Sequence, residues 1–174
     1  TPYLMAFPNM QNIGSLVVEV PPGAVAGAIL DFWQRPLTDC GQTGPDKGAG
    51  GKFLVLGPGD PDLKPDGYYV FRSPTVNIWI GMRVLDPDPV KAKATMAALR
   101  IYAYSQRDNP PNAPHQTPAG RKWSGTQPRG LAYWEGLAKV INEEPAQERD
   151  RMILGMLQTM GIEKGKPFNP NARQ

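Results

Sequence analysis

The sequence predicts a mainly β fold of the α+β class: a β-sandwich or jelly-roll-like core followed by a C-terminal helical hairpin. Short runs of β-branched and aromatic residues alternate with polar ones in the first half of the chain. Gly (19) and Pro (20) together supply 39 of the 174 residues. That share is about twice the average and favours many turns and short elements. Clear helical spacing of apolar residues begins only near residue 88.

Strands are expected at residues 3–7, 15–20, 28–37, 53–56, 67–72 and 75–85. The last is the clearest, because every second residue is apolar and a strict period of two indicates one buried face. Residues 28–37 also fit a helical stripe through Ile29, Phe32 and Trp33. We interpret them as a strand, since Pro36 disfavours a continuing helix and a Gly-rich loop follows.

The Gly-rich segment 41–51 is expected to be an ordered hairpin loop with Asp46, Lys47 and Lys52 at its tip. A P-loop is excluded, because Phe53 follows Lys52 and position 46 is not Gly. A dinucleotide fingerprint is excluded because a strand, not a helix, follows the glycines. The glycines are interpreted as turn residues, and anion binding by the loop amides and the two lysines is the alternative.

Helices dominate the rest of the chain. Asp88 and Pro89 have the pattern of an N-cap and a first helical residue. That helix is expected to give way near Arg100 to a short extended piece at 101–104. Further helices are expected at 131–141 and from Pro145, and the latter ends in a Schellman-type stop at Gly161. Its methionine stripe is expected to pack in the core: Met152, Met156 and Met160.

We expect one domain over residues 1–174, with four regions in order. They are a strand-rich part, a helix with a Pro-rich loop, a helical hairpin and a polar tail, at 1–87, 88–129, 130–162 and 163–174. The loop at 109–129 is irregular and contains little apolar surface.

Several chemistries are disfavoured by what the sequence lacks. Cys40 is the only cysteine and His115 the only histidine, so no internal disulfide and no zinc-type site is expected. Cys40 is interpreted as a small, partly buried residue. An oxygen-ligand cation site at the aspartates of 60–66 is disfavoured by the prolines between them, which indicate a solvated turn. We therefore expect neither a metal nor a cofactor.

Partners are constrained by charge and hydropathy. The net charge is +3 and the basic residues are scattered, so nucleic-acid binding is not expected. No apolar run approaches the ~20 residues that a membrane-spanning helix needs.

Seven residues are candidates for a ligand site: Asp31, Trp33, Asp46, Lys47, Lys52, Trp79 and Arg83. Trp79 shares a strand face with Arg83, and Trp33 is expected to share one with Asp31. Mixed aromatic and charged faces of this kind can stack a sugar or another flat ligand. The alternative for both tryptophans is a second core layer or a subunit contact.

Short motifs spread over nearly the whole chain resemble the bacterial family called domain of unknown function 1254. They lie at 31–34 (DFWQ), 44–48 (GPDKG), 50–54 (GGKFL), 101–102 (IY), 105–106 (SQ), 109–111 (NPP), 148–150 (ERD) and 161–170 (GIEKGKPFNP). The resemblance implies a β-sandwich, an export signal with a periplasmic or secreted location, and oligomers. It also implies a companion C-terminal β-domain of family 1214. The chain would then be an N-terminally incomplete fragment of a longer protein.

The resulting expectation is a non-catalytic binding or oligomer-assembly module of an exported bacterial two-domain protein. Its expected partners are a second copy of the chain, the companion domain, and a small-molecule, sugar or anion ligand. The alternative is a hydrolase- or lyase-like enzyme that uses the charged candidates, with a site completed by missing segments: Asp31, Asp46, Lys47, Lys52 and Arg83.

Overall fold

The computed structural model describes residues 1–112, 114–122 and 124–171. Trp123 and the last three residues of the expected polar tail lie outside this range. Contacts divide the chain into two compact units, Thr1–Gln116 and Thr117–Gln174, and each is described by itself. The expectation of a single domain stays a prediction. Within the described residues, no helix is long and apolar enough to cross a bilayer.

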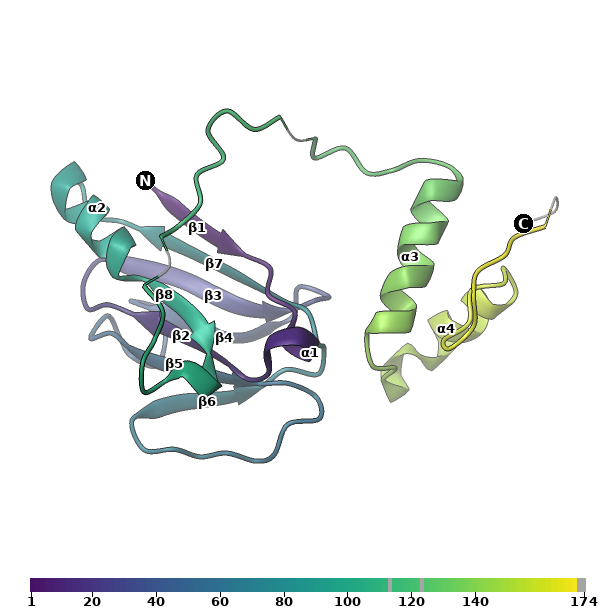
Figure 1. The fold of residues 1–174 in the computed structure, drawn as a ribbon, viewed down its shortest axis with the longest axis horizontal. Helices are drawn as coiled ribbons and strands as arrows, with labels where there is room; N and C mark the ends of the chain where they lie inside the picture. Colours follow the sequence, from purple (N-terminus) through teal and green to yellow (C-terminus); the bar gives the residue numbers. More distant parts are fainter. Residues whose placement is uncertain (113, 123, 172–174) are drawn as a thin grey trace. The chain divides into compact units, whose positions relative to one another are not determined.

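The first unit is a sandwich of two four-stranded sheets (Figure 1). The first sheet has the order β1 (Tyr3–Ala6), β7 (Ile78–Val84), β3 (Val25–Asp31), β4 (Pro36–Gly41). The second has the order β6 (Tyr68–Arg72), β5 (Gly51–Leu56), β2 (Leu16–Val20), β8 (Arg100–Ala103). Neighbouring strands are antiparallel, except for the parallel pair of β5 and β6.

The core lies between the two sheets and follows the alternation of their strands. In β7 the inward residues are Ile78, Ile80, Met82 and Val84, all buried as expected. The inward residues of the second sheet that pack against them include Leu16, Val18, Phe53 and Val55. Each fully buried side chain of this kind contributes about 1.5–3 kcal/mol of transfer free energy. The mainly β sandwich is therefore confirmed, whereas its finer description as a jelly roll stays a prediction.

Two helices complete this unit. α1 (Met10–Ile13) was not expected; it begins after Asn9, whose side chain accepts a hydrogen bond from the Gln11 amide at 2.9 Å. α2 (Pro89–Ala98) begins as predicted, since the Asp88 carboxylate accepts from the Val90 amide at 2.8 Å. The extended piece expected after α2 is β8, and a 3₁₀ turn (Tyr104–Gln106) follows it.

The second unit contains α3 (Leu131–Glu143), a 3₁₀ turn (Glu148–Asp150) and α4 (Arg151–Gln158). α4 therefore begins later than the expected start at Pro145. The Schellman stop is confirmed, because the Gly161 amide donates to the Gln158 carbonyl and the Ile162 amide to the Leu157 carbonyl, both at 3.0 Å.

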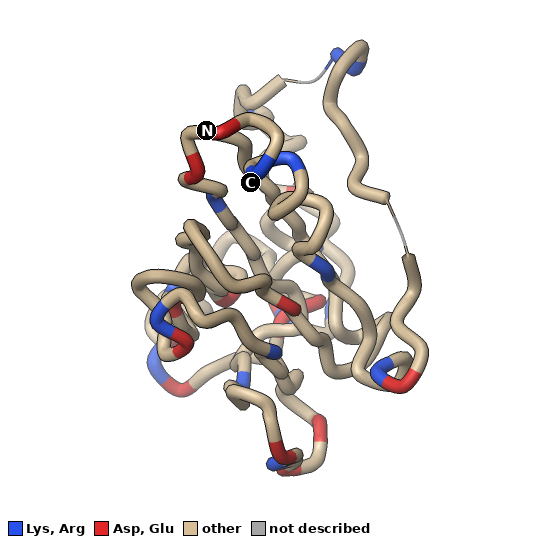
Figure 2. Tube along the Cα trace, turned by 90° about the vertical axis from the view of Figure 1, so that its left-hand side faces the viewer, with Lys and Arg blue, Asp and Glu red and all other residues tan. Residues whose placement is uncertain are grey.

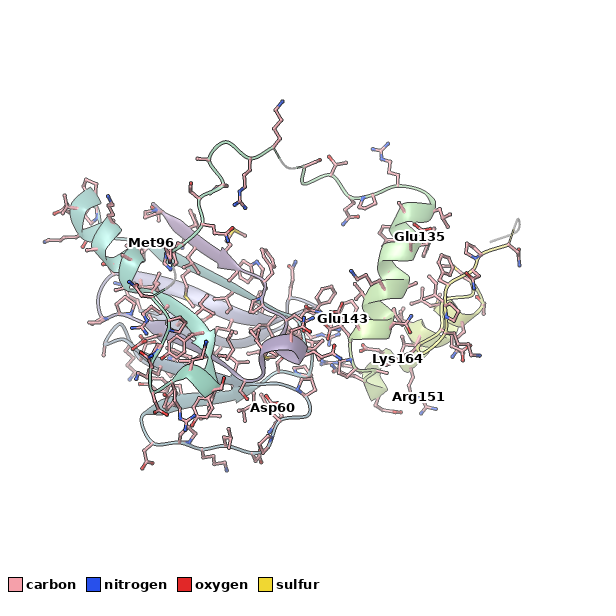
Figure 3. The ribbon with its side chains drawn as sticks, viewed as in Figure 1. Asp60, Met96, Glu135, Glu143, Arg151 and Lys164 are labelled. Carbon is pink, nitrogen blue, oxygen red and sulfur yellow. The ribbon has the colours of Figure 1, made fainter. Side chains whose placement is uncertain are left out.

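The end of α3 is capped by a lysine that follows α4 in sequence. The Lys164 ammonium donates to the carbonyls of Ile141, Asn142 and Glu144 at 3.1, 3.0 and 2.6 Å. Figure 3 labels Lys164 beside this end of the helix. A cation placed there satisfies carbonyls that have no partner within the helix and also complements its dipole.

The prediction that the methionine stripe packs in the core is wrong for two of its members. Met152 and Met156 are 74% and 60% exposed, whereas Met160 is half-buried. α4 has only eight residues, and its more buried Leu154 and Leu157 lie on the opposite side of the helix from Met152. The side that carries Met152 therefore stays open to solvent.

The interpretation of residues 28–37 as one strand is also wrong. β3 ends at Asp31, and the chain turns back before β4 begins at Pro36. The Asp31 carboxylate closes the turn by accepting from the Arg35 amide at 2.9 Å, and Gln34 adopts a positive φ of 58°. Short acidic side chains stabilise turns in this way, and the apolar pattern on either side conceals the reversal.

Segment 41–51 is not a hairpin loop, because β4 belongs to the first sheet and β5 to the second. Gly41 begins the crossing with a φ of 75°, and a Cβ at this position would overlap the Val25 carbonyl oxygen. The Gly41 amide donates to the carboxylate of buried Asp46 at 2.8 Å. Lys52 lies within β5 rather than at the tip of the loop.

We predict that Gly41→Ala destabilises the protein by about 2–4 kcal/mol, since it combines a strained φ with a backbone overlap. Chemical denaturation of the full chain measures this loss. Gly59→Ala is the matched control, because its Cβ would meet open space and its φ is not positive. Equal midpoints for the two variants would contradict the prediction.

We also predict that the Cys40 thiol is inert in the folded protein. Cys40 is fully buried in β4, and burial, together with the negative charges of Asp46 and Asp39, raises its pKa well above the usual range. Iodoacetamide should therefore label it only after denaturation, as followed by mass spectrometry. Labelling of the native protein at the rate of the unfolded chain would show that the interpretation is wrong.

Candidate functional site

The seven candidate residues do not form one site. Figure 2 shows charged residues of both signs interspersed along the chain rather than gathered by sign. The candidates occupy four places: the β3–β4 turn (Asp31, Trp33), the crossing loop (Asp46, Lys47), the outer face of the second sheet (Lys52) and the outer face of the first sheet (Trp79, Arg83).

At the first two places, the β3–β4 turn and the loop from β4 to β5, the acidic residues have structural roles in closing turns. Asp31 is buried and closes its turn, whereas Trp33 lies in the turn and not on a strand face, contrary to expectation. Its ring meets Phe32 edge to face, with centroids 5.0 Å apart. Asp46 holds the Gly41 amide, and the neighbouring Lys47 is exposed with a φ of 48°.

The outer face of the first sheet brings together Trp79 and Arg83, as predicted from their spacing. The strand register sets Leu30 beside Trp79, Ala28 beside Gly81 and Ala26 beside Arg83. On the other side of β7, Met5 lies beside Gly81 and Tyr3 beside Arg83. We call this surface the outer apolar face: Tyr3, Met5, Ala26, Ala28, Leu30, Trp79 and Gly81, with Arg83 and Asp39 as its charged members.

Trp79 lies flat along its own strand because of Gly81. The indole ring occupies the space that a Cβ at Gly81 would need, so no larger residue fits beneath it. Small side chains on β3, at Ala26 and Ala28, continue this flat floor across the sheet. At the edge strand, Tyr3 and Met5 stand out from the floor and are 61% and 60% exposed. The result is a broad, apolar surface with one aromatic wall.

Arg83 and Asp39 are the two charged residues of this face. Arg83 lies on β7 and Asp39 on β4, with β3 between them and an offset of two residues along the strands, so they stand about 12 Å apart on the sheet. Both are exposed, and within the part of the chain that the structure describes neither forms a salt bridge. The face therefore presents one positive and one negative group on either side of an apolar centre.

Sequence reasoning missed most of this surface. The alternation of Tyr3 and Met5 with Leu4 and Ala6 was a usable signal for an outward face on β1. No local pattern, however, showed that this strand pairs with β7 or that Asp39 lies two strands away from Arg83.

Comparison with known proteins gives a family and a fold. The model of the family described as "Protein of unknown function (DUF1254)" matches residues 1–103, more than half of the chain. No curated protein matches the sequence. The crystal structure of the VPA0106 protein from Vibrio parahaemolyticus is similar, with a TM-score of 0.68 and 17% identity. The match covers 99% of this chain and 44% of that one, so this chain spans less than half of the Vibrio protein. The chain belongs to the DUF1254 family.

Proposed function

We propose that the protein is a non-catalytic assembly module whose outer apolar face binds a second copy of the chain. The observation that carries the proposal is the continuous apolar surface around Trp79, with protruding Tyr3 and Met5. Contiguous exposed apolar surface of this kind marks interaction sites. Tryptophan and tyrosine are also the side chains that contribute most to binding at such interfaces.

The charges of the face suit a symmetric contact. Two sheets pack face to face about 10 Å apart, and a two-fold axis relates the same patch on both copies. Consider a two-fold axis that lies midway between the facing first sheets of the two copies and runs perpendicular to the line from Arg83 to Asp39. It sets Arg83 of each copy opposite Asp39 of the other, so that each of these charges faces one of opposite sign. The flat floor at Ala28 and Gly81 then lies at the centre of the contact.

The size of the face indicates a weak dimer. Four strands and the seven residues of β3 span roughly 19 Å by 23 Å. That footprint is smaller than the ~800 Å² per partner of a standard stable interface. We therefore expect association in the micromolar range or weaker, with further contact area supplied by other parts of a longer protein.

The proposal places this module in an exported bacterial protein with a companion C-terminal β-domain. The extent of the Vibrio protein supports the idea of a further domain, since more than half of it lies outside the match. Export to the periplasm or beyond rests on the family resemblance and stays a prediction. The enzymatic alternative also stays a hypothesis.

Charge reversal tests the proposed contact. We predict that Arg83→Asp and Asp39→Arg each weaken self-association at least tenfold, because like charges then face each other. The double variant should restore it, since the pair is re-formed with its signs exchanged. Sedimentation velocity of the full chain over a range of concentrations measures all four proteins.

An apolar variant and a matched control complete the design. Ala28→Glu places a charge at the centre of the face and should abolish association. Val90→Glu places the same charge at an exposed apolar residue of α2 and should leave association unchanged. A wild-type chain that stays monomeric, or a double variant that stays dissociated, would refute the proposal.

A further inference from the structure

The outer face of the second sheet, on the other side of the sandwich, carries a row of polar side chains. The register sets Tyr68 of β6 beside Lys52 of β5, Lys52 beside Glu19 of β2, and Glu19 beside Arg100 of β8. We call these four residues the charged row. Each strand of the sheet contributes one member, and two cations flank a single carboxylate.

The contacts within the row fix the carboxylate and leave one cation without an anionic partner. The Tyr102 hydroxyl donates to Glu19 Oε2 at 3.2 Å, and Arg100 Nε lies 3.7 Å from the same oxygen. The Lys52 ammonium lies over the Tyr68 ring, 5.8 Å from its centroid. Among the described residues, Lys52 has no salt-bridge partner. The side chains of Glu19 and Arg100 are 28% and 39% exposed, so solvent reaches them.

A small apolar cluster lies beside the row and packs against Tyr68. Val17, Leu54 and Tyr102 are buried next to it on the same face. Burial, and then the neighbouring Glu19 charge, raises the pKa of Tyr102 to about 12, so its hydroxyl stays protonated and keeps donating to Glu19. The ring of Tyr68 is held edge to face against Tyr104, with centroids 5.8 Å apart. Contacts with neighbouring aromatic side chains therefore position the Glu19 carboxylate and the Tyr68 ring.

We infer that the charged row binds a small carboxylate that also carries hydroxyl groups, such as a sugar acid. Lys52 supplies a positive charge that forms no salt bridge with any described residue, and Arg100 supplies donors for carboxylate oxygens. Glu19 is an acceptor for a ligand hydroxyl, and the Tyr68 ring offers a flat apolar flank for a sugar. A neutral sugar lacks the group that the cations attract, and a simple carboxylate lacks the group that Glu19 accepts from.

The inference is independent of the proposed assembly, because the charged row and the outer apolar face lie on opposite sides of the sandwich. Glucuronate, glucose and acetate are the three probes, added to the full chain and followed by chemical shifts of the backbone amides. We expect saturable shifts at the row for glucuronate, and binding of glucose and acetate weaker by at least tenfold.

Variants separate binding from cross-strand stabilisation. Lys52→Met should weaken glucuronate binding at least tenfold while folding is retained, because Lys52 takes part in no salt bridge of the described chain. Lys52→Arg should restore most of it. Lys91→Met removes an exposed lysine of α2, outside all candidate residues, and should bind as wild type does. Absence of saturable glucuronate binding, equal binding of all three probes, or an equal loss of binding in Lys91→Met would overturn the inference.

Discussion

The pairing of β3 with β7 along seven residues is the constraint on which the sandwich depends. Their antiparallel register sets Val25 beside Val84 and Ile29 beside Ile80, and all four side chains are buried between the sheets. A slip of β3 by one residue against β7 would turn Val25 and Ile29 toward solvent while Val84 and Ile80 kept facing the core. Because the lost burial would amount to several kcal/mol, the core admits only this register. The two neighbouring strands, β1 and β4, then take their positions on either side of this pair.

The same register also determines which side chains lie on the outer faces of the sheets. Once alternate residues of β7 face the core, Trp79, Gly81 and Arg83 must face outward together. In the second sheet, the alternation that buries Val18 and Phe53 turns Glu19 and Lys52 to the opposite side. Both candidate surfaces are therefore consequences of core packing, and neither needs a loop to assemble it. Sites carried by strands are held more firmly than sites on loops, which suits recognition by preformed surfaces.

Local signals in the sequence predicted what local physics determines. The alternation in β7, the Asp88 cap and the Schellman stop at Gly161 all depend on residues within a few positions of one another. The reversal after Asp31 was missed because its positive-φ position is occupied by Gln34 and not by a glycine, the residue that usually marks such a turn. The charged row was missed for a different reason. Glu19 and Arg100 become neighbours through strand pairing over a long separation in sequence, and no single-sequence pattern reveals that pairing.

The lysine that caps α3 has a consequence for how the second unit can be divided. Lys164 lies well beyond α4 in sequence, yet it neutralises the carbonyl end of the preceding helix, and the Gly165 amide donates to Asn142 of that helix at 2.6 Å. The end of α3 is thus tied by hydrogen bonds to residues 164 and 165, which follow α4. A protease cut or a chain end placed before residue 164 would remove these hydrogen bonds and let the C-terminal turn of α3 fray. A chain end placed after residue 165 would leave the C-terminal turn of α3 intact.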